Sequence, residues 1–529
     1  MAVCSHFCRS FLIGCLFAGN VIGQNPAKPI ILALSGGDEP SGDRFQRLTR
    51  SGFLSAESGI VFAGELPDRS AQAGLSDLPA LWRGQTEDFS LLARVDGVAP
   101  GTGKAVFASL PQLSGISVTG EVTFLAALRE GSGEPAVVKS EAAGLWSEIG
   151  GAGLQLLLRQ GDELLGQPGL IVDGFATGAF ATAHVAKGTG EAVFSVLLKS
   201  DHLDSALLRV SVSGGSVTKV QILARDGMSA PGMEANFGLL HGPYTDPARM
   251  DDEGNVAFAA VVGPKRNDSL WYQARGGEVQ KVFAAGDPAP GAGGATFLRL
   301  QKPSLGTKGV LAFHATLNAK GDESLVLKND GIWRGSVVAG FQPILRKGDA
   351  NLPGMPEGSK VGQVWSGWLT SGNHGAWMGR LDVNGDGFVD GFSDPYAIFA
   401  DTSGSMSLVI SQGDEAPDLP GATMRELDHP VVGGLEQLAF LGVLTGSGIT
   451  SANDKGVWRQ APKGGKLSLL LRSGDLLETM KGRKTVEKID LPGSGQKERR
   501  WEQPVMDKRG HLLVFVTFTD GSTAQVLLP

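Results

Sequence analysis

Short apolar runs separated by glycine-rich turns recur along almost the whole chain. In each cycle an apolar run leads into a turn built on Gly-Asp or Asp-Gly, often followed by Pro-Gly. The eight turns are Gly37-Asp38, Asp96-Gly97, Gly161-Asp162, Asp226-Gly227, Gly286-Asp287, Gly348-Asp349, Gly413-Asp414 and Gly474-Asp475. Successive turns lie 59 to 65 residues apart. Such a regular recurrence indicates a tandem array of similar supersecondary units.

The unit that starts at Gly286-Asp287 shows what one repeat contains. Its apolar segments are Ala295–Leu300, Gly309–Leu317, Gly331–Trp333 with its flanks, and Pro343–Arg346. These segments are rich in β-branched, aromatic and aliphatic residues, and turn formers bound each of them. Glycine supplies the positive φ of tight turns, and aspartate can hydrogen-bond its own backbone there. The sequence therefore predicts four short strands in each repeat and no helix with caps.

Aromatic residues occupy matched positions in the repeats. The second segment carries Phe62, Phe124, Phe194, Phe258, Phe313, Trp377, Phe440 and Phe515. The third carries Trp82, Trp146, Trp271, Trp333 and Trp458, with Leu208 and Phe399 in equivalent places. We assign these side chains to a continuous core and not to ligand contact. Burial of each should contribute about 1.5–3 kcal/mol.

Four-stranded units of this length predict an all-β fold, a β-propeller of eight four-stranded blades in one domain over residues 24–529. The chain begins the array with a lone apolar segment at 29–34, and the last unit, with strands in 511–528, lacks that segment. We expect the N-terminal strand to complete the last blade, because closure removes exposed strand edges. Seven blades is the main alternative, since the units at Gly161 and Gly474 are weak copies. An open array or two packed sandwiches remain open.

The composition fits an exported globular protein. The chain contains 77 glycines, 42% hydrophobic residues and only 19% charged residues, and its formal net charge is −8. The apolar content argues against disorder, and an acidic chain without a basic cluster is a poor partner for nucleic acid. Residues 1–23 are typical of a signal peptide, and we expect no transmembrane segment. All three cysteines lie there, and Cys15 also fits a lipoprotein signal.

The pattern of a glycine shortly before Ala-Phe, then Gly-x-Trp, then Gly-Asp-x-x-Pro-Gly resembles the bacterial tandem repeats named for NxxGxxAF. The best match is Asp251–Phe258, and the leading Asn is absent from most units. The resemblance covers residues 30 to 529. It implies an exported repeat protein and no particular activity.

One local motif has the spacing of a calcium loop. Calcium takes six to eight oxygen ligands, which short loops supply from alternate positions. The loop between the second and third segments of the sixth unit offers Asp382, Asn384, Asp386, the Phe388 carbonyl and Asp390, with Gly387 at the bend. Ser393 occupies the position of the usual glutamate, and Asp394 is adjacent. The motif is similar to the loops of dockerins and of FG-GAP propeller blades. We expect one structural Ca²⁺, bound with a Kd on the order of 10⁻⁴–10⁻³ M; a metal-free turn is the alternative.

No catalytic motif emerges from the sequence. The histidines show no HxH or HExxH spacing, and neither a GxSxG elbow nor a P-loop is present. Trp365, Trp368 and Trp377 form a local tryptophan cluster. This cluster could be a carbohydrate platform, although we favour packing for it.

We therefore predict a secreted, periplasmic or cell-surface propeller that is structural, adhesive or ligand-binding and not an enzyme. Its partner would be an unidentified surface protein or polysaccharide, and we expect a monomer. The alternative is a propeller hydrolase or lyase that acts on polysaccharide with acids near the central channel.

Overall fold

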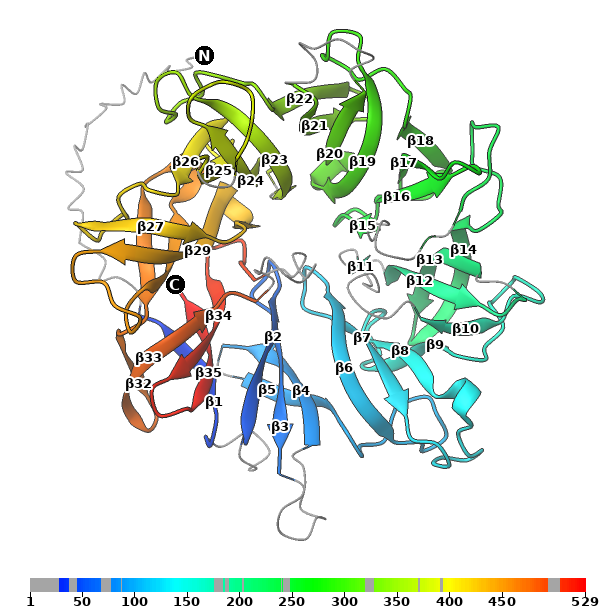
Figure 1. Cartoon of the computed structure of the whole chain (residues 1–529). Coiled ribbons are helices and arrows are strands. Elements are labelled where there is room, and N and C mark those ends of the chain that lie inside the picture. The colour runs from blue at the N-terminus through cyan, green and yellow to red at the C-terminus, as the bar shows by residue number, and fades with distance from the viewer. Residues whose placement is uncertain are drawn as a thin grey trace, which may run out of the picture.

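The computed structural model forms a ring of eight antiparallel sheets, which are the blades of a β-propeller (Figure 1). It describes residues 28–529 except 38–44, 68–77, 87, 176–183, 186–189, 202–203, 239, 241–247, 319–327, 370–371, 391–392 and 493–504. The signal-peptide prediction, the three cysteines and Asp38 lie outside the described residues. The predicted all-β fold with eight blades is confirmed.

Blades 1 to 4 take up the first half of the ring. Blade 1 contains β2 (Arg47–Leu54), β3 (Ile60–Leu66), β4 (Leu78–Gln85) and β5 (Asp88–Arg94), and blade 2 contains β6 (Phe107–Ile116), β7 (Val122–Leu128), β8 (Ala143–Ser147) and β9 (Gln155–Arg159). Blade 3 contains β10 (Val172–Phe175), β11 (His184–Val185), β12 (Glu191–Leu198), β13 (Asp204–Ser213) and β14 (Ser216–Arg225). Blade 4 contains β15 (Arg249–Met250), β16 (Val256–Val262), β17 (Asn267–Gln273) and β18 (Val279–Ala284).

Blades 5 to 8 complete the ring. Blade 5 contains β19 (Thr296–Leu305), β20 (Leu311–Asn318), β21 (Asp330–Ser336) and β22 (Gly340–Arg346), and blade 6 contains β23 (Lys360–Leu369), β24 (Gly375–Asp382), β25 (Tyr396–Ala400) and β26 (Ser407–Ser411). Blade 7 contains β27 (Ala422–Leu427), β28 (Val431–Gly433), β29 (Gln437–Gly446), β30 (Lys455–Gln460) and β31 (Leu467–Arg472). Blade 8 contains β32 (Leu476–Thr479), β33 (Gly482–Asp490), β34 (Leu512–Phe518), β35 (Thr523–Leu528) and β1 (Ile30–Leu34).

The described helices are four single 3₁₀ turns. They are η1 (Lys139–Glu141), η2 (Thr307–Gly309), η3 (Gly434–Glu436) and η4 (Pro462–Gly464). No helix in the described part of the chain is long and apolar enough to cross a membrane.

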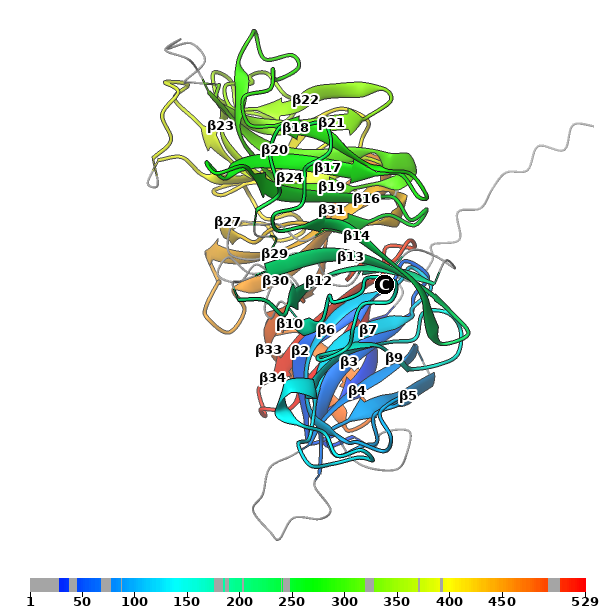
Figure 2. The same ribbon diagram turned by 90° about the vertical axis from the view of Figure 1, so that its right-hand side faces the viewer.

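The N-terminal strand closes the ring, as the sequence predicts. β1 pairs antiparallel with β35, with Ile30 opposite Leu527 and Leu34 opposite Ala524. The blue and red ends of the chain lie together in both ribbon views (Figures 1 and 2). The last blade is therefore built from both ends of the domain, and β1 covers the edge that β35 would otherwise expose.

The matched aromatic positions face each other across the two middle strands of every blade. The pairs are Phe62–Trp82, Phe124–Trp146, Phe194–Leu208, Phe258–Trp271, Phe313–Trp333, Trp377–Phe399, Phe440–Trp458 and Phe515–Gln525. In five blades the Phe and Trp rings are stacked, with interplanar angles of 14–20°. These tryptophans are 0% exposed, so their assignment to the core is correct.

The turns also have a direct physical explanation. In five Gly-Asp turns the aspartate side chain accepts a hydrogen bond from the backbone N–H three residues earlier: Asp162, Asp287, Asp349, Asp414 and Asp475. The indole N–H of Trp146, Trp333 and Trp458 donates to the carbonyl of Pro100, Pro290 and Pro417, respectively, at 2.9–3.1 Å. Because these prolines follow the turns, one hydrogen bond ties the blade core to the turn that enters the same blade.

A polar contact between blades recurs in every second blade. An arginine follows the third-strand aromatic position in blades 1, 3, 5 and 7 and bonds to a group at or near the end of a strand in the next blade. The contacts are Arg83 to Glu148, Arg209 to Gln273, Arg334 to Asp401, and Arg459 to the carbonyls of Gly510 and Pro529. These arginines are 125 or 126 residues apart. The ring is therefore four tandem pairs of blades, a period twice that of the turns.

Arg209 provides a test of this paired arrangement. It is 4% exposed, and it donates to Gln273 Oε1 at 2.9 Å and to Glu191 Oε2 at 2.8 Å. Arg209→Met would leave Glu191 paired with the more exposed Arg275, whose Nε lies 3.2 Å from Glu191 Oε2. Removing one member of a buried pair costs about 3 kcal/mol or more, so we expect a large fall in the urea midpoint.

The control is Arg483→Met, because Arg483 is 70% exposed and pairs with an exposed glutamate. An exposed pair contributes about 0–1 kcal/mol. Equal effects of the two substitutions on the free energy of unfolding would contradict the importance of the contact between blades.

Candidate functional site

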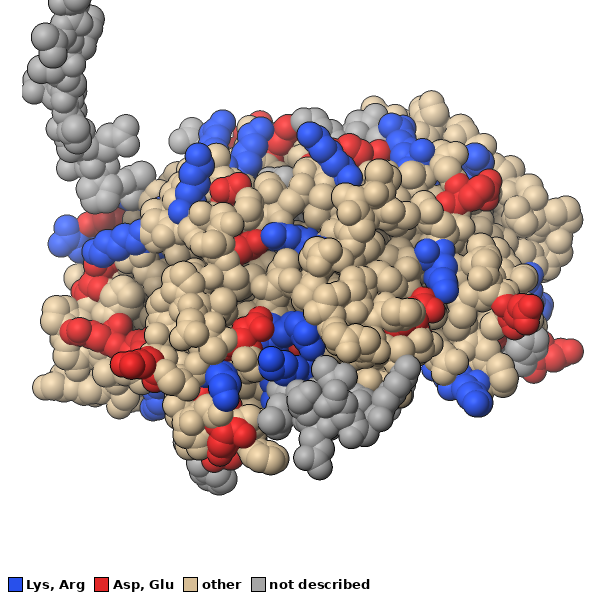
Figure 3. Space-filling model, turned by 90° about the horizontal axis from the view of Figure 1, so that it is seen from above, with Lys and Arg blue, Asp and Glu red and all other residues tan. Residues whose placement is uncertain are grey.

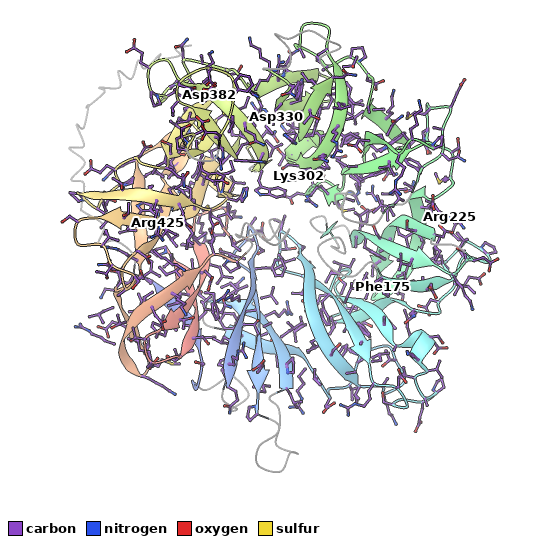
Figure 4. All side chains as sticks on the ribbon, viewed as in Figure 1. Phe175, Arg225, Lys302, Asp330, Asp382 and Arg425 are labelled. Atoms are coloured by element: carbon purple, nitrogen blue, oxygen red, sulfur yellow. The ribbon has the colours of Figure 1, made fainter. Side chains whose placement is uncertain are left out.

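The predicted calcium loop connects β24 to β25 in blade 6. In a four-stranded meander this connection lies on the same face of the ring as the Gly-Asp turns. Asp382 ends β24 and is 1% exposed, whereas Phe388 in the loop is 73% exposed. Asp382 lies on blade 6, while Lys302 lies nearer to the ring centre (Figure 4). The loop thus has a buried origin and an exposed tip.

Three side chains of the loop bond to backbone N–H groups within it. Asp382 Oδ2 accepts from the Gly387 N–H at 2.8 Å. Asn384 Oδ1 accepts from the Asp386 N–H at 3.2 Å, and Asp386 Oδ1 accepts from the Phe388 N–H at 2.8 Å. Asn384 and Asp386 thus form two consecutive Asx turns, and the bond of Asp382 spans both of them. Asp390 lies at the end of the loop, where its carboxylate accepts from the N–H and the hydroxyl of Ser393, both at 2.6 Å.

Asp394 closes the base of the loop. Its Oδ1 accepts from the Val383 N–H at 3.2 Å and its Oδ2 from the Asp390 N–H at 2.8 Å. Arg380 on β24 donates to the carbonyls of Asp390 and Asp394, and its guanidinium lies 4.2 Å from the centroid of the Tyr396 ring. The loop therefore returns to the blade at a fixed point.

One carboxylate oxygen of the loop is buried without a partner. Asp382 Oδ1 has no hydrogen-bond partner, although the residue is 1% exposed. An unsatisfied buried carboxylate oxygen is costly, about 1–3 kcal/mol or more for a charged group. Within the described residues, no group of three or more His, Cys, Asp or Glu side chains already converges as a metal cluster. The donor set, all oxygen with one unsatisfied carboxylate, fits a hard cation such as Ca²⁺.

The three clustered tryptophans lie in different surroundings. Trp377 is 1% exposed and belongs to the core between blades 5 and 6. Trp365 is stacked on Tyr396, with ring centroids 5.4 Å apart. Trp368 lies under the guanidinium of Arg249 from blade 4, 5.3 Å from it. The structure does not bring the three rings to one common surface.

A second group of polar side chains includes Lys302, which lies near the ring centre (Figure 4). Register shifts interrupt the innermost strands, and a bulge of this kind re-aims side chains. Lys302 lies in the shift between Gln301 and Ser304 and has a positive φ of 52°. Burial, together with the positive charge of Lys302, lowers the pKa of His429 to about 4. The charge of Lys302 in blade 5 therefore acts on His429 in blade 7.

Acidic groups lie close to His429, because Asp428 directly precedes it in the chain. Burial raises the pKa of Asp428, and the negative charges of Glu426 and Asp490 raise it further. Arg50 Nε lies 3.2 Å from Asp490 Oδ2. The negative charge of Asp490 in blade 8 therefore acts on the Asp428 carboxyl group in blade 7.

A serine, an aspartate and a histidine meet at the closure of the ring, but not in the order of a catalytic triad. Ser58 Oγ donates to Asp507 Oδ2 at 2.6 Å, and His511 Nδ1 lies 2.8 Å from the same oxygen. Nucleophilic catalysis needs the histidine between serine and aspartate. Here Asp507, which is 0% exposed, joins a turn of blade 8 to blade 1.

The surface gives no strong charge pattern on the face seen in Figure 3. Lysine and arginine are interspersed with aspartate and glutamate there.

The chain belongs to a family of unknown function, DUF7453, whose model matches residues 27–355 and 382–524. The match resumes at Asp382, the first residue of the predicted calcium loop. No curated protein matches the chain. The NxxGxxAF resemblance stays a prediction.

Solved structures similar to this chain resemble it in fold only. The β-propeller domain of the Trilobed protease from Pyrococcus furiosus is 8% identical with a TM-score of 0.36, covering 82% of this chain and all of that one. The polysaccharide lyase Uly1 is 10% identical with a TM-score of 0.36, covering 91% and 99%. A puromycin-hydrolyzing peptidase of Mycobacterium tuberculosis is 8% identical with a TM-score of 0.35, covering 93% and 62%.

His429 should make stability depend on pH. Its folded-state pKa of about 4 lies below the ordinary value of 6.5. The unfolded chain therefore binds the proton first, and stability that is present above pH 6.5 is lost as the pH falls toward 4. The difference corresponds to roughly 3 kcal/mol.

The comparison of His429→Gln with the unaltered chain isolates this contribution from that of other groups. Unfolding free energies measured from pH 7 to pH 4 should fall less steeply for the variant. Parallel pH profiles would show that His429 does not titrate in this way.

Proposed function

We propose that the chain is an exported, non-enzymatic propeller, a structural, adhesive or ligand-binding module stabilised by one Ca²⁺ in the blade 6 loop. The observation that carries the calcium proposal is the buried, unpartnered Oδ1 of Asp382 inside a loop of oxygen donors. The leader of residues 1–23, or lipid attachment at Cys15, would account for export. Its partner would be a surface protein or a polysaccharide, and we propose a monomer.

Asp382, Asn384, Asp386, the Phe388 carbonyl and Asp390 would hold the ion, and Asp394 would keep the base of the loop closed. Bound calcium would screen the carboxylates and stiffen the hairpin. The residues themselves already preorganise the loop, because the Asx bonds, Asp394 and Arg380 fix its path.

Calcium should raise the melting temperature of the full chain. At a hundred times the Kd, a ligand of the folded state adds about 2.7 kcal/mol. Asp382→Asn should abolish the rise without lowering the melting temperature in EDTA, because the amide removes a buried negative charge and can still accept from the Gly387 N–H. Isothermal titration and thermal scans with CaCl₂ or EDTA check both expectations.

Asp520→Asn is the matched control. Asp520 lies in the corresponding loop of blade 8, is exposed, and pairs with Lys484. This variant should keep the calcium-dependent rise. An unaltered chain that gives no calcium heat and no change in melting temperature would refute the calcium proposal.

A second candidate is a polysaccharide hydrolase or lyase at the ring centre. The observation that favours it is the neighbouring pair Asp428 and His429: burial raises the pKa of the Asp428 carboxyl group and lowers the pKa of the His429 imidazole. Neutral imidazole and a carboxyl group of raised pKa are suited to general base and acid roles. A polysaccharide panel assayed for binding and cleavage, with and without calcium, decides between the two. Cleavage that Asp428→Asn abolishes would overturn the non-enzymatic proposal; binding without cleavage would support it.

A further inference from the structure

A lysine from the neighbouring strand reaches the calcium loop. Lys360 is the first residue of β23 and lies opposite Asp382 in the register of β23 and β24. Its Nζ donates a hydrogen bond to the carbonyl oxygen of Gly385, in the middle of the loop. The ammonium group is thus placed beside the acidic loop by the strand pairing itself.

The loop packs closely against the same strand. A Cβ on Gly362 would lie 2.6 Å from Val389 Cγ2 and 3.2 Å from Asp382 Cβ, so only glycine leaves room for the loop at this point of β23. A Cβ on Gly385, which has a positive φ of 70°, would lie 3.6 Å from Lys360 Nζ. This packing keeps the lysine and the loop together.

The metal-free site carries two more negative than positive charges. The loop and its base carry four carboxylates, those of Asp382, Asp386, Asp390 and Asp394. Two cationic groups bond to the loop backbone, Lys360 and Arg380. The remaining two negative charges equal the charge of one Ca²⁺. Without Lys360 the metal-free loop would carry a larger unbalanced charge.

We propose that Lys360 is a tethered counter-ion of this loop, which stabilises the metal-free state and lowers the affinity for Ca²⁺. The inference rests on the calcium site proposed above. The ammonium group of Lys360 and a bound Ca²⁺ would repel each other. Because Lys360 stabilises the metal-free loop, calcium binding becomes less favourable by the same free energy. Lys360 would then set the weak affinity that suits a calcium-rich exterior.

The test compares Lys360→Met with Lys360→Arg in the full chain, with CaCl₂ alone as the probe. Lys360→Met keeps the length and apolar stem of the side chain and removes its charge. We expect it to tighten the calcium Kd by about tenfold and to lower the melting temperature in EDTA. Lys360→Arg, which keeps the charge, should resemble the unaltered chain in both measurements.

Lys466→Met is the control at a distant site. Lys466 is 74% exposed and pairs with Asp418 in blade 7, away from the blade 6 loop. It should leave the calcium Kd unchanged.

The outcomes separate the two proposals. Calcium binding by the unaltered chain with an equal or weaker affinity in Lys360→Met overturns the role of Lys360 and leaves the calcium site standing. Calcium binding by Lys360→Met but not by the unaltered chain or Lys360→Arg supports the role of Lys360 as a counter-ion. Absence of calcium heat in every variant overturns both the site and the inference.

Discussion

The stacked Phe–Trp pair across the two middle strands is the interaction around which five of the eight blades are built. Trp146 is fully buried, and its indole N–H must find an acceptor there. It finds the carbonyl of Pro100 in the turn that enters the blade. Because the same bond recurs at Trp333 and Trp458, the core of each of these blades also fixes the path of the turn. A single buried side chain thus sets both the sheet spacing and the connection from the preceding blade.

The arginine contacts between blades follow from this arrangement. The residue after the third-strand aromatic position points out of the blade core toward the neighbouring blade, as the side chain alternates along a strand. Arg83 and Arg334 use this position to bind an acid of the next blade. Burial raises the pKa of Glu148 even though the Arg83 charge opposes the rise. The contact therefore places a partly desolvated carboxylate between two blades.

The sequence predicts the blade architecture well because the same pattern recurs in every blade. The turn spacing, the aromatic positions and closure by residues 29–34 all follow from local patterns, and even the exchange of Trp377 and Phe399 in blade 6 preserves the pair. The paired period was missed, although an arginine after Trp82, Trp333 and Trp458 could have shown it. Contacts such as that of Arg249 with Trp368 join non-adjacent blades. The pattern that repeats from blade to blade does not predict such contacts.

The predicted calcium loop is fastened differently from the corresponding connections of blades 2, 5 and 7. In blades 2, 5 and 7 an arginine at the end of the fourth strand donates to a carbonyl of this connection, as Arg159 does to Glu141. The fourth strand of blade 6 ends in Ser411 instead. Asp394 and Arg380 fasten the loop from within its own hairpin. Because this connection is fastened from within its own hairpin, it can carry its own charge pattern without disturbing the scaffold, which is the way in which loops on a constant fold acquire separate chemistry.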